Sequence, residues 1–457
     1  MIAFALCSVP RRAALGAHPK GAQTMLTHPA RPGAKLVRTG ILLSLAVVVA
    51  SAAQAQTLKW HKKIGYCASP TVADVDGDDT LDLVLGTSGM LYALNGETGE
   101  TFWHTAVGGD ILTCPAIADV DNDARIEVVF GCTDRRVTAV DLETGEPRWS
   151  FRTRREVTSS PVIADVQGDG TQEILFGSQD GQLYMLAGRG GKLWWSKDLR
   201  APVSASPAVA DVNGDGIMEA FVCADDGNFY ALNAKDGRVL WSNRVGIRNA
   251  RSVALAPLTD EPRWGAFISA GVMRLMEAGR EKRVWSFSGS GDTCASGSPA
   301  IADLNGDGQL DVVFGADDGN VYALAGLTGE KLWEARVSPR VGVESCPAIA
   351  DVNGDGSPDV LIASPNRRLF CLDGKTGSPL WSQPLAYQTA GSPVVAEVNR
   401  DGKLAVGIGT EDGEFYLYAC EASGQVLWAK ARGDGRNTGA YPAARSFGKA
   451  MVGVPRR

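Results

Sequence analysis

The sequence predicts an all-β protein, an eight-bladed β-propeller of four-stranded antiparallel blades. Three observations carry this prediction. A unit of about 46 residues recurs along the chain, each unit holds four short apolar runs separated by turn residues, and each unit ends in a tryptophan. A period of this length is typical of rings and solenoids, whose units cannot bury their apolar faces alone.

The apolar runs are clearest in the unit at 206–241. A short apolar run is followed by an acidic, glycine-rich loop, which must be irregular. The run at 220–223 is apolar throughout, as in a strand that is buried on both faces. Asp226-Gly227 then supplies the residues of a tight hairpin, and two further runs complete four strands.

The tryptophans lie 44 to 48 residues apart, at Trp103, Trp149, Trp195, Trp241, Trp285, Trp333, Trp381 and Trp428. A buried indole removes roughly 150–250 Å² from water, which suits a residue that fills the gap between neighbouring blades. We therefore interpret these tryptophans as structural and not as a cofactor stack. Trp60 precedes the first unit and imitates a fourth strand, so the sequence leaves open whether it or Trp428 completes blade eight.

The strongest chemical signal is the loop between the first and second strands, which places oxygen-bearing side chains at positions 1, 3, 5 and 9. The candidate metal ligands are Asp74, Asp76, Asp78 and Asp82 in blade one; Asp119, Asp121, Asp123 and Glu127 in blade two; Asp165, Asp169 and Glu173 in blade three; Asp211, Asn213, Asp215 and Glu219 in blade four; Asp303, Asn305, Asp307 and Asp311 in blade six; and Asp351, Asn353, Asp355 and Asp359 in blade seven.

Carboxylates gathered in nine residues repel one another, at about 4 kcal/mol for a pair 4 Å apart near a protein surface. Calcium, which takes six to eight oxygen ligands, would remove this cost. An EF-hand is excluded because its twelfth position requires Glu, whereas Leu85 and Phe130 stand there. The alternative is that each loop is an Asx-turn held by its own backbone without metal. Blade three has Gln167 at position 3, blade five has lost the loop, and blade eight has Ala405 at position 9.

Two families share these motifs. The segment Ala93 to Trp103 resembles the tryptophan-docking motif of pyrroloquinoline-quinone-type propeller repeats, and residues 210–216 are similar to the FG-GAP repeats of integrin α-chain propellers. The resemblance covers nearly all of 57–430 and implies the propeller fold. Quinoprotein dehydrogenases of the first family hold their cofactor against a vicinal cysteine pair. This sequence has no adjacent cysteines, so pyrroloquinoline quinone is not expected as a cofactor.

The chain divides into a leader at 1–55, a propeller at 56–432 and a tail at 433–457. The leader has no acidic residue and ends in an apolar run at 41–50 followed by Ala53-Gln54-Ala55, which predicts a secretory signal cleaved before Gln56. Ten apolar residues are too few to span a bilayer, and no cysteine follows the cleavage point, so no stable membrane anchor is expected. These features predict a periplasmic or secreted protein. We expect the tail to wrap the surface or to be disordered.

The net charge limits the kinds of binding partner, and the cysteine content indicates which disulfides are possible. Without the leader, 39 basic and 52 acidic residues remain, a net charge of −13, which argues against nucleic acid. Disulfides are able to form in a secreted chain. The candidate pairs are Cys67 with Cys114 and Cys294 with Cys346, because they lie near equivalent repeat positions.

The connectors between blades carry candidate ligand-binding arginines at Arg155, Arg200, Arg248, Arg251 and Arg340. In a propeller, such connectors lie near one mouth of the central channel. Basic groups there would suit an anionic ligand such as a uronate or a carboxylated peptide. The alternative is that these are ordinary solvated loop charges.

We therefore expect a calcium-binding, non-catalytic module that binds a protein or carbohydrate ligand or acts as a scaffold, similar to integrin-type propellers and to the propeller lipoproteins of outer-membrane assembly. No catalytic residue is identified: only His61 and His104 follow the leader, and each simply follows a tryptophan in a repeated strand. The alternatives are a pyrroloquinoline-quinone-dependent dehydrogenase that uses the channel, and an enzyme that acts on polysaccharides.

Overall fold

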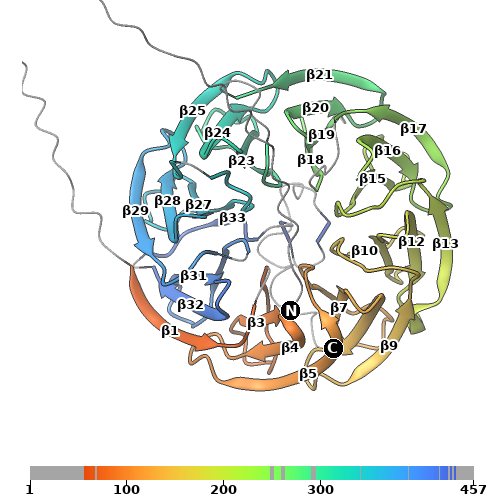
Figure 1. Ribbon diagram of the computed structural model, residues 1–457, viewed down its shortest axis with the longest axis horizontal. Coiled ribbons are helices and arrows are strands. Elements are labelled where there is room, and N and C mark those ends of the chain that lie inside the picture. Colours follow the sequence, from red (N-terminus) through yellow and green to blue (C-terminus); the bar gives the residue numbers. More distant parts are fainter. Residues whose placement is uncertain are drawn as a thin grey trace, which may run out of the picture. The chain divides into compact units, whose positions relative to one another are not determined.

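The computed structural model describes residues 56–66, 69–246, 252–258, 263–289, 295–339, 341–389, 391–420, 422–430, 433–434 and 437–438. These residues form eight antiparallel sheets arranged as blades around a central axis (Figure 1). The predicted eight-bladed β-propeller is therefore confirmed. The only helix described is a 3-10 turn, η1 (Arg189–Gly191), and no described helix is long and apolar enough to cross a bilayer.

Each blade runs from an inner strand beside the axis to an outer strand on the rim. The inner strands are β2 (Thr71–Ala73), β6 (Ala116–Ala118), β10 (Val162–Ala164), β14 (Ala208–Ala210), β18 (Ala254–Pro257), β22 (Ala300–Ala302), β26 (Ala348–Ala350) and β30 (Val394–Glu397). The second strands are β3 (Asp82–Gly86), β7 (Glu127–Cys132), β11 (Glu173–Gly177), β15 (Glu219–Cys223), β19 (Trp264–Ser269), β23 (Asp311–Gly315), β27 (Asp359–Ser364) and β31 (Leu404–Gly409).

The third strands are β4 (Ser88–Leu94), β8 (Arg136–Asp141), β12 (Gln182–Ala187), β16 (Asn228–Asn233), β20 (Met273–Glu277), β24 (Asn320–Ala325), β28 (Arg368–Asp373) and β32 (Glu414–Ala419). The outer strands are β5 (Thr101–Asp110), β9 (Pro147–Arg152), β13 (Leu193–Asp198), β17 (Val239–Arg244), β21 (Lys282–Phe287), β25 (Lys331–Arg336), β29 (Pro379–Pro384) and β1 (Thr57–Lys63).

The ring closes through the N-terminal strand. β1 pairs antiparallel with β32 and so becomes the outer strand of blade eight. Trp60 on β1 takes the wedge position: its Nε1 donates to the carbonyl of Gly96 at 3.1 Å, and its ring lies against Gly99 of blade one. Blade eight is therefore built from both ends of the chain, which answers the question that the repeat pattern left open.

Trp428 is consequently not a wedge between blades. It lies on β33 (Val426–Trp428), which pairs with the inner strand β26 of blade seven and is drawn inside the ring in Figure 1. Its side chain is 1 % exposed. Because β1 already occupies the outer edge of blade eight, the last apolar segment of the repeat is displaced toward the axis.

Five of the other tryptophans confirm the wedge interpretation. Trp103 Nε1 donates to the carbonyl of Leu142 in the next blade at 2.8 Å, and its ring packs on Gly145. Gly145 has φ +71°, and a Cβ placed there would lie 2.5 Å from the indole. Only glycine fits such a position without strain. The same pairing of indole and glycine recurs for Trp149 with Gly191, Trp195 with Gly237, Trp285 with Gly329 and Trp333 with Gly377.

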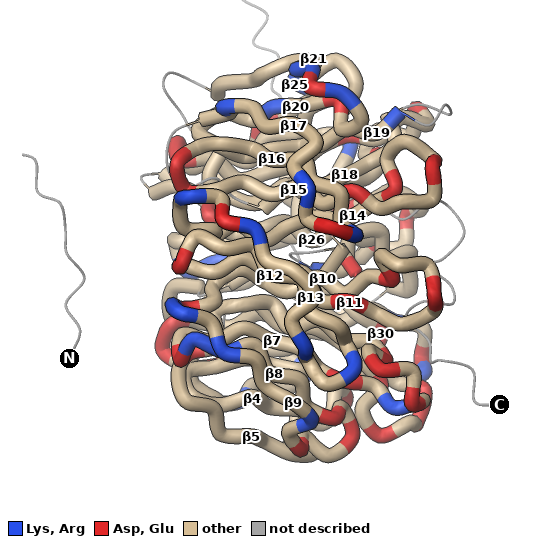
Figure 2. The backbone as a smooth tube through the Cα atoms, turned by 90° about the vertical axis from the view of Figure 1, so that its right-hand side faces the viewer, with Lys and Arg blue, Asp and Glu red and all other residues tan. Residues whose placement is uncertain are grey.

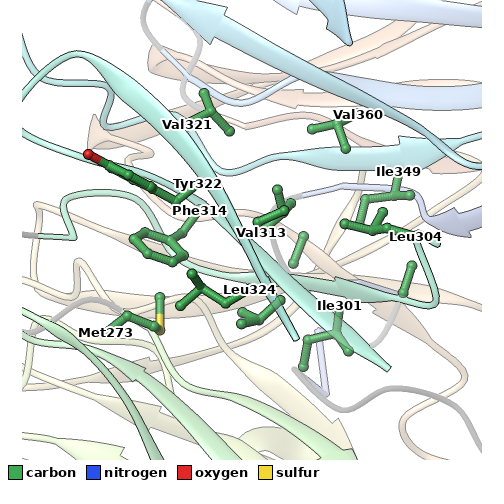
Figure 3. Close-up of a cluster of buried hydrophobic side chains, with 14 of the residues drawn as sticks. Met273, Ile301, Leu304, Val313, Phe314, Val321, Tyr322, Leu324, Ile349 and Val360 are labelled. Atoms are coloured by element: carbon green, nitrogen blue, oxygen red, sulfur yellow. The ribbon is translucent and has the colours of Figure 1, made fainter. Parts of the chain in front are cut away.

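The hydrophobic core continues from blade to blade. Figure 3 shows one cluster, in which Phe314 of blade six lies near Met273 of blade five, and Val321 of blade six lies near Val360 of blade seven. The second strands supply most of this apolar surface, because both of their faces are covered. The core therefore fixes the blades, and leaves turns and connectors to form the two faces of the ring.

Candidate functional site

The two ends of the blades carry different kinds of residues. Because successive strands are antiparallel, the acidic loops between first and second strands lie at one end, which we call the loop face. The hairpins between second and third strands, and the connectors between blades, lie at the other end, the connector face. Figure 2 shows the blades edge-on, with acidic loops along one end.

Each acidic loop is folded around its own carboxylates. In blade six, Asp303 Oδ1 accepts a hydrogen bond from the Gly306 N–H at 2.8 Å, and Asp303 Oδ2 accepts one from Gly308 at 2.9 Å. Asp307 Oδ1 accepts the Gln309 N–H at 2.7 Å. Blades one, three and seven repeat the bonds to positions 4 and 6, and all seven acidic loops repeat the bond from position 7 to position 5. The hydrogen bonds within each loop are thus those of the Asx-turn alternative. They do not use every carboxylate oxygen of the loop, so the remaining oxygens are available as metal ligands.

The ninth position is the first residue of the second strand and is buried. In blade six, Asp311 is 1 % exposed, and its Oδ2 accepts the Leu304 N–H at 3.0 Å. Among the described residues, no hydrogen bond reaches Asp311 Oδ1 or the equivalent Asp359 Oδ1. These two buried oxygens are therefore available to coordinate a cation. A turn that is held only by its backbone would not require a buried carboxylate oxygen without a hydrogen bond.

Burial, with a smaller contribution from neighbouring loop carboxylates, raises the pKa of every ninth-position acid. The pKa of Asp82 rises to about 6, and the pKa values of Glu127, Glu173, Glu219, Asp311 and Asp359 rise to about 7. The cost of ionising a buried carboxyl raises its pKa, and a bound cation would offset that cost.

The donor set fits calcium. One carboxylate oxygen each from Asp74, Asp76 and Asp78 lie within 4.8 Å of one another, as do those from Asp119, Asp121 and Glu127. Clustered carboxylate oxygens are the ligands that calcium prefers. In blade eight, Glu397 still accepts the Gly402 N–H at 2.8 Å, but the ninth position is the apolar Ala405.

The predicted arginines on the connector face are only partly described. Arg155 and Arg200 are exposed, and they lie on the connectors after blades two and three. Arg200 has a left-handed backbone, with φ 65°, and its N–H donates to Asp198 Oδ1 at 2.8 Å. Arg248, Arg251 and Arg340 lie outside the described residues, as does the predicted leader.

The described residues of the C-terminal segment, 426–430, 433–434 and 437–438, lie on the inner side of the ring. Beyond β33, the Val395 N–H of blade eight donates to the carbonyl of Ala429 at 2.9 Å, and the Val209 N–H of blade four donates to that of Thr438 at 3.1 Å. Asn437 is completely buried, and its Nδ2 donates to the carbonyls of Cys114 and Pro161. The expected surface position of the tail is therefore wrong for these residues.

Lys430 lies at the centre of this segment and is 1 % exposed. Its Nζ donates to Thr71 Oγ1 at 2.7 Å, to Asn437 Oδ1 at 2.8 Å and to the carbonyl of Pro115 at 3.2 Å. Three acceptors satisfy a buried ammonium group, which would otherwise be costly. The segment is therefore bonded to the inner strands of blades one, four, seven and eight, and to residues just before the inner strands of blades two and three.

Sequence reasoning missed this arrangement, although one signal was present. Trp60 and Trp428 competed for one outer position, so one of them had to lie elsewhere. Cys114 and Cys346 are free thiols, and their predicted partners Cys67 and Cys294 lie outside the described residues. Cys114 Sγ instead lies 3.4 Å from Lys430 Nζ.

Comparison with solved structures finds the same fold. BamB from Moraxella catarrhalis matches with a TM-score of 0.57 at 15 % identity, covering 80 % of this chain and 100 % of that chain. The computationally designed Ika8 protein matches with 0.58 at 16 %, covering 80 % and 100 %, and Saccharomyces cerevisiae Sqt1 with 0.62 at 9 %, covering 80 % and 99 %. At these identities, the likeness concerns the fold alone. No curated protein matches the chain.

A family match covers almost the whole propeller. Residues 46–224, 218–358 and 355–454 match the family of quinone-type repeats described as outer membrane protein assembly factor BamB. This match supports the resemblance to pyrroloquinoline-quinone-type repeats, whereas the resemblance to integrin repeats stays an interpretation of the loop sequences. The chain belongs to the family described as outer membrane protein assembly factor BamB.

Proposed function

We propose that this chain is an extracytoplasmic, non-catalytic scaffold that binds other proteins and is stabilised by calcium in its acidic loops. The single observation that carries the proposal is the C-terminal segment in the channel. A propeller enzyme would use the channel for its cofactor, but here Lys430 and Asn437 are buried on the inner side of the ring and bonded to each other and to residues of blades one, two and three.

The remaining surface is suited to binding rather than to catalysis. Exposed hydrophobic residues lie on the rim and on the connector face, including Trp194 and Tyr387. Membership of a family named for outer-membrane assembly supports a partner among the proteins that assemble the outer membrane. A protein ligand is therefore favoured over the carbohydrate ligand that the sequence left equally open.

Calcium would act as a structural ion in this scaffold. A ligand that binds only the folded state stabilises it by about 2.7 kcal/mol per site at a concentration of 100 times Kd. The buried oxygens of Asp311 and Asp359, which have no hydrogen-bond partner among the described residues, support this role.

The proposal is tested by reconstitution and by crosslinking. The purified full chain, supplied with pyrroloquinoline quinone and calcium, should show no dye-linked oxidation of alcohols or sugars. A photo-crosslinking residue at Tyr387 should capture a discrete envelope protein in living cells, whereas the same residue at Asp78 on the loop face should not. Quinone-dependent oxidation would overturn the scaffold proposal, as would an absence of crosslinks from every connector-face position.

A further inference from the structure

Two hairpins on the connector face place arginine where the other blades place glycine. The turns of blades three, four, six and eight contain glycines with φ between 85° and 90°: Gly181, Gly227, Gly319 and Gly413. The same turn holds Arg135 in blade two, with φ 72°, and Arg367 in blade seven, with φ 60°. A left-handed backbone is unfavourable for a residue with a Cβ, and such strain is often kept for the sake of the side chain.

Blade two adds further arginines to this strained turn. Arg136 follows Arg135 and is paired directly across the strands with Arg152 of β9. Like charges opposite each other destabilise a sheet. Arg154 and Arg155 begin the connector that follows. All five side chains are exposed, and together they form what we call the arginine patch.

The backbone of the arginine patch is fixed by a buried threonine. The Thr153 N–H donates to the carbonyl of Arg135 at 2.9 Å. Its hydroxyl lies 3.1 Å from the same carbonyl and 2.5 Å from the carbonyl of Arg155. The hairpin and the connector are thus held side by side, so that their arginines project from a rigid support, which lowers the entropic cost of binding.

Within the part of the chain that the structure describes, most guanidinium groups of the arginine patch have no protein partner. Arg136 lies 3.8 Å from Asp134, the closest ion pair of the patch. Among the described residues, no hydrogen bond or ion pair involves the guanidinium groups of Arg135, Arg152 or Arg155. Of the neighbouring acids, Asp180 accepts the backbone N–H of Arg154 and the hydroxyl of Tyr184, and Glu156, which follows Arg155, is exposed.

We propose that the arginine patch binds an acidic segment of a partner protein. This inference rests on the proposed scaffold function and names its binding surface. Guanidinium groups form paired, charge-assisted hydrogen bonds with carboxylates, and free donors on a rigid support favour such contacts. The net charge of −13 without the leader would repel a broad anionic surface such as a membrane. A short acidic segment can contact the patch without approaching the acidic loop face.

Fluorescence anisotropy with a labelled octaglutamate peptide tests the proposal, using the full chain at low salt. The test variant combines Arg135→Gly, Arg152→Gln and Arg155→Gln. We expect it to bind at least about tenfold more weakly than the wild type, the effect of losing one charge-assisted hydrogen bond. Its melting temperature should be equal or higher, because glycine relieves the strained turn and the opposed Arg136–Arg152 pair is removed.

Blade seven supplies a matched control. Arg367→Gly with Arg368→Gln removes the same strained turn and the same following arginine, but this hairpin faces Pro384 across the strands and has no arginine in the connector after it. Peptide affinity should stay within about twofold of the wild type. Equal weakening by both variants, or no octaglutamate binding by the wild type, would overturn the proposal.

Vesicles of phosphatidylglycerol provide the second arm. Binding to vesicles that depends on the arginine patch, without peptide binding, would overturn the proposal in favour of a membrane contact. Failure of the patch is distinguishable from failure of the scaffold function. Quinone-dependent oxidation would refute the scaffold whatever the patch binds, whereas equal affinity of patch variant and wild type refutes only the patch.

Discussion

The loop face and the connector face differ in how strictly their residues repeat. On the loop face, six loops share one hydrogen-bonding scheme and one buried acid at the start of the second strand. On the connector face, equivalent turns hold glycine in four blades and arginine in two. The repeated residues maintain the ring, and the departures from the repeat are the places where a specific partner can be recognised.

The largest expected effect is a loss of stability at Lys430. This residue lies near the start of the inner strands, at the connector face, but we expect it to hold the ring together and not to recognise a partner. Lys430→Met leaves Asn437 Oδ1 and the Pro115 carbonyl without their donor. We expect a loss of about 3 kcal/mol in the free energy of unfolding, measured by urea denaturation. Lys192→Met, at an exposed lysine, is the control and should cost far less. A neutral Lys430→Met would show that the segment does not hold the ring.

Two glycines of the loop face separate blade docking from local turn geometry. Gly145 (φ +71°) and Gly168 (φ +74°) have similar backbones, but a Cβ would meet Trp103 at the first and nothing within 4 Å at the second. Gly168→Ala should cost about 1 kcal/mol for the left-handed residue alone. Gly145→Ala should cost about 3 kcal/mol, because overpacking is added. Equal costs would remove the wedge role of Trp103.

The buried acid distinguishes a complete loop from an incomplete one. Asp359→Ala removes the acceptor of the Val352 N–H, at 3.1 Å, and one candidate calcium ligand. The expected cost in calcium is about 2 kcal/mol. Asp401→Ala in blade eight, whose ninth position is already Ala405, should cost less than about 1 kcal/mol. Similar losses of unfolding free energy in the two variants would mean that a ninth-position acid stabilises the protein no more than an acid in the exposed turn does.

The last effect, which is spread over six loops instead of one residue, is a pH dependence of the chelated protein. Six buried carboxyls have folded pKa values of about 6 to 7, above those of the unfolded chain, so the folded state binds protons more tightly. Their contribution to stability is complete below about pH 4 and is lost as the pH rises through 6 to 7. In chelator, the melting temperature should therefore fall between pH 5 and pH 8. Calcium should reduce this fall, and identical curves with and without calcium would contradict the linkage.

The sequence predicts the blades well because their causes are local. A strand such as Val128 to Phe130 and the indole–glycine pair of Trp103 and Gly145 are each set within neighbouring units. The closure of the ring could not be predicted in this way. β1 and the segment around Trp428 both match the outer strand of blade eight, and which of them takes that edge depends on contacts across the whole ring. Lys430 reads as a surface residue in sequence, because its partners Thr71 and Pro115 lie more than 300 residues away.

The same limit applies to the candidate sites. The loop ligands follow from spacing, but which oxygens stay without hydrogen bonds depends on the packing of each second strand. The arginine patch could not be predicted, because Arg136 and Arg152 are neighbours only through the register of β8 and β9.

Calcium titration of the demetallated full chain tests the central claim most directly. Isothermal calorimetry should report about six ions per chain, one for each loop that keeps its ninth-position acid, together with a rise in melting temperature. A titration without binding heat, combined with a melting temperature that neither chelator nor calcium changes, would contradict it.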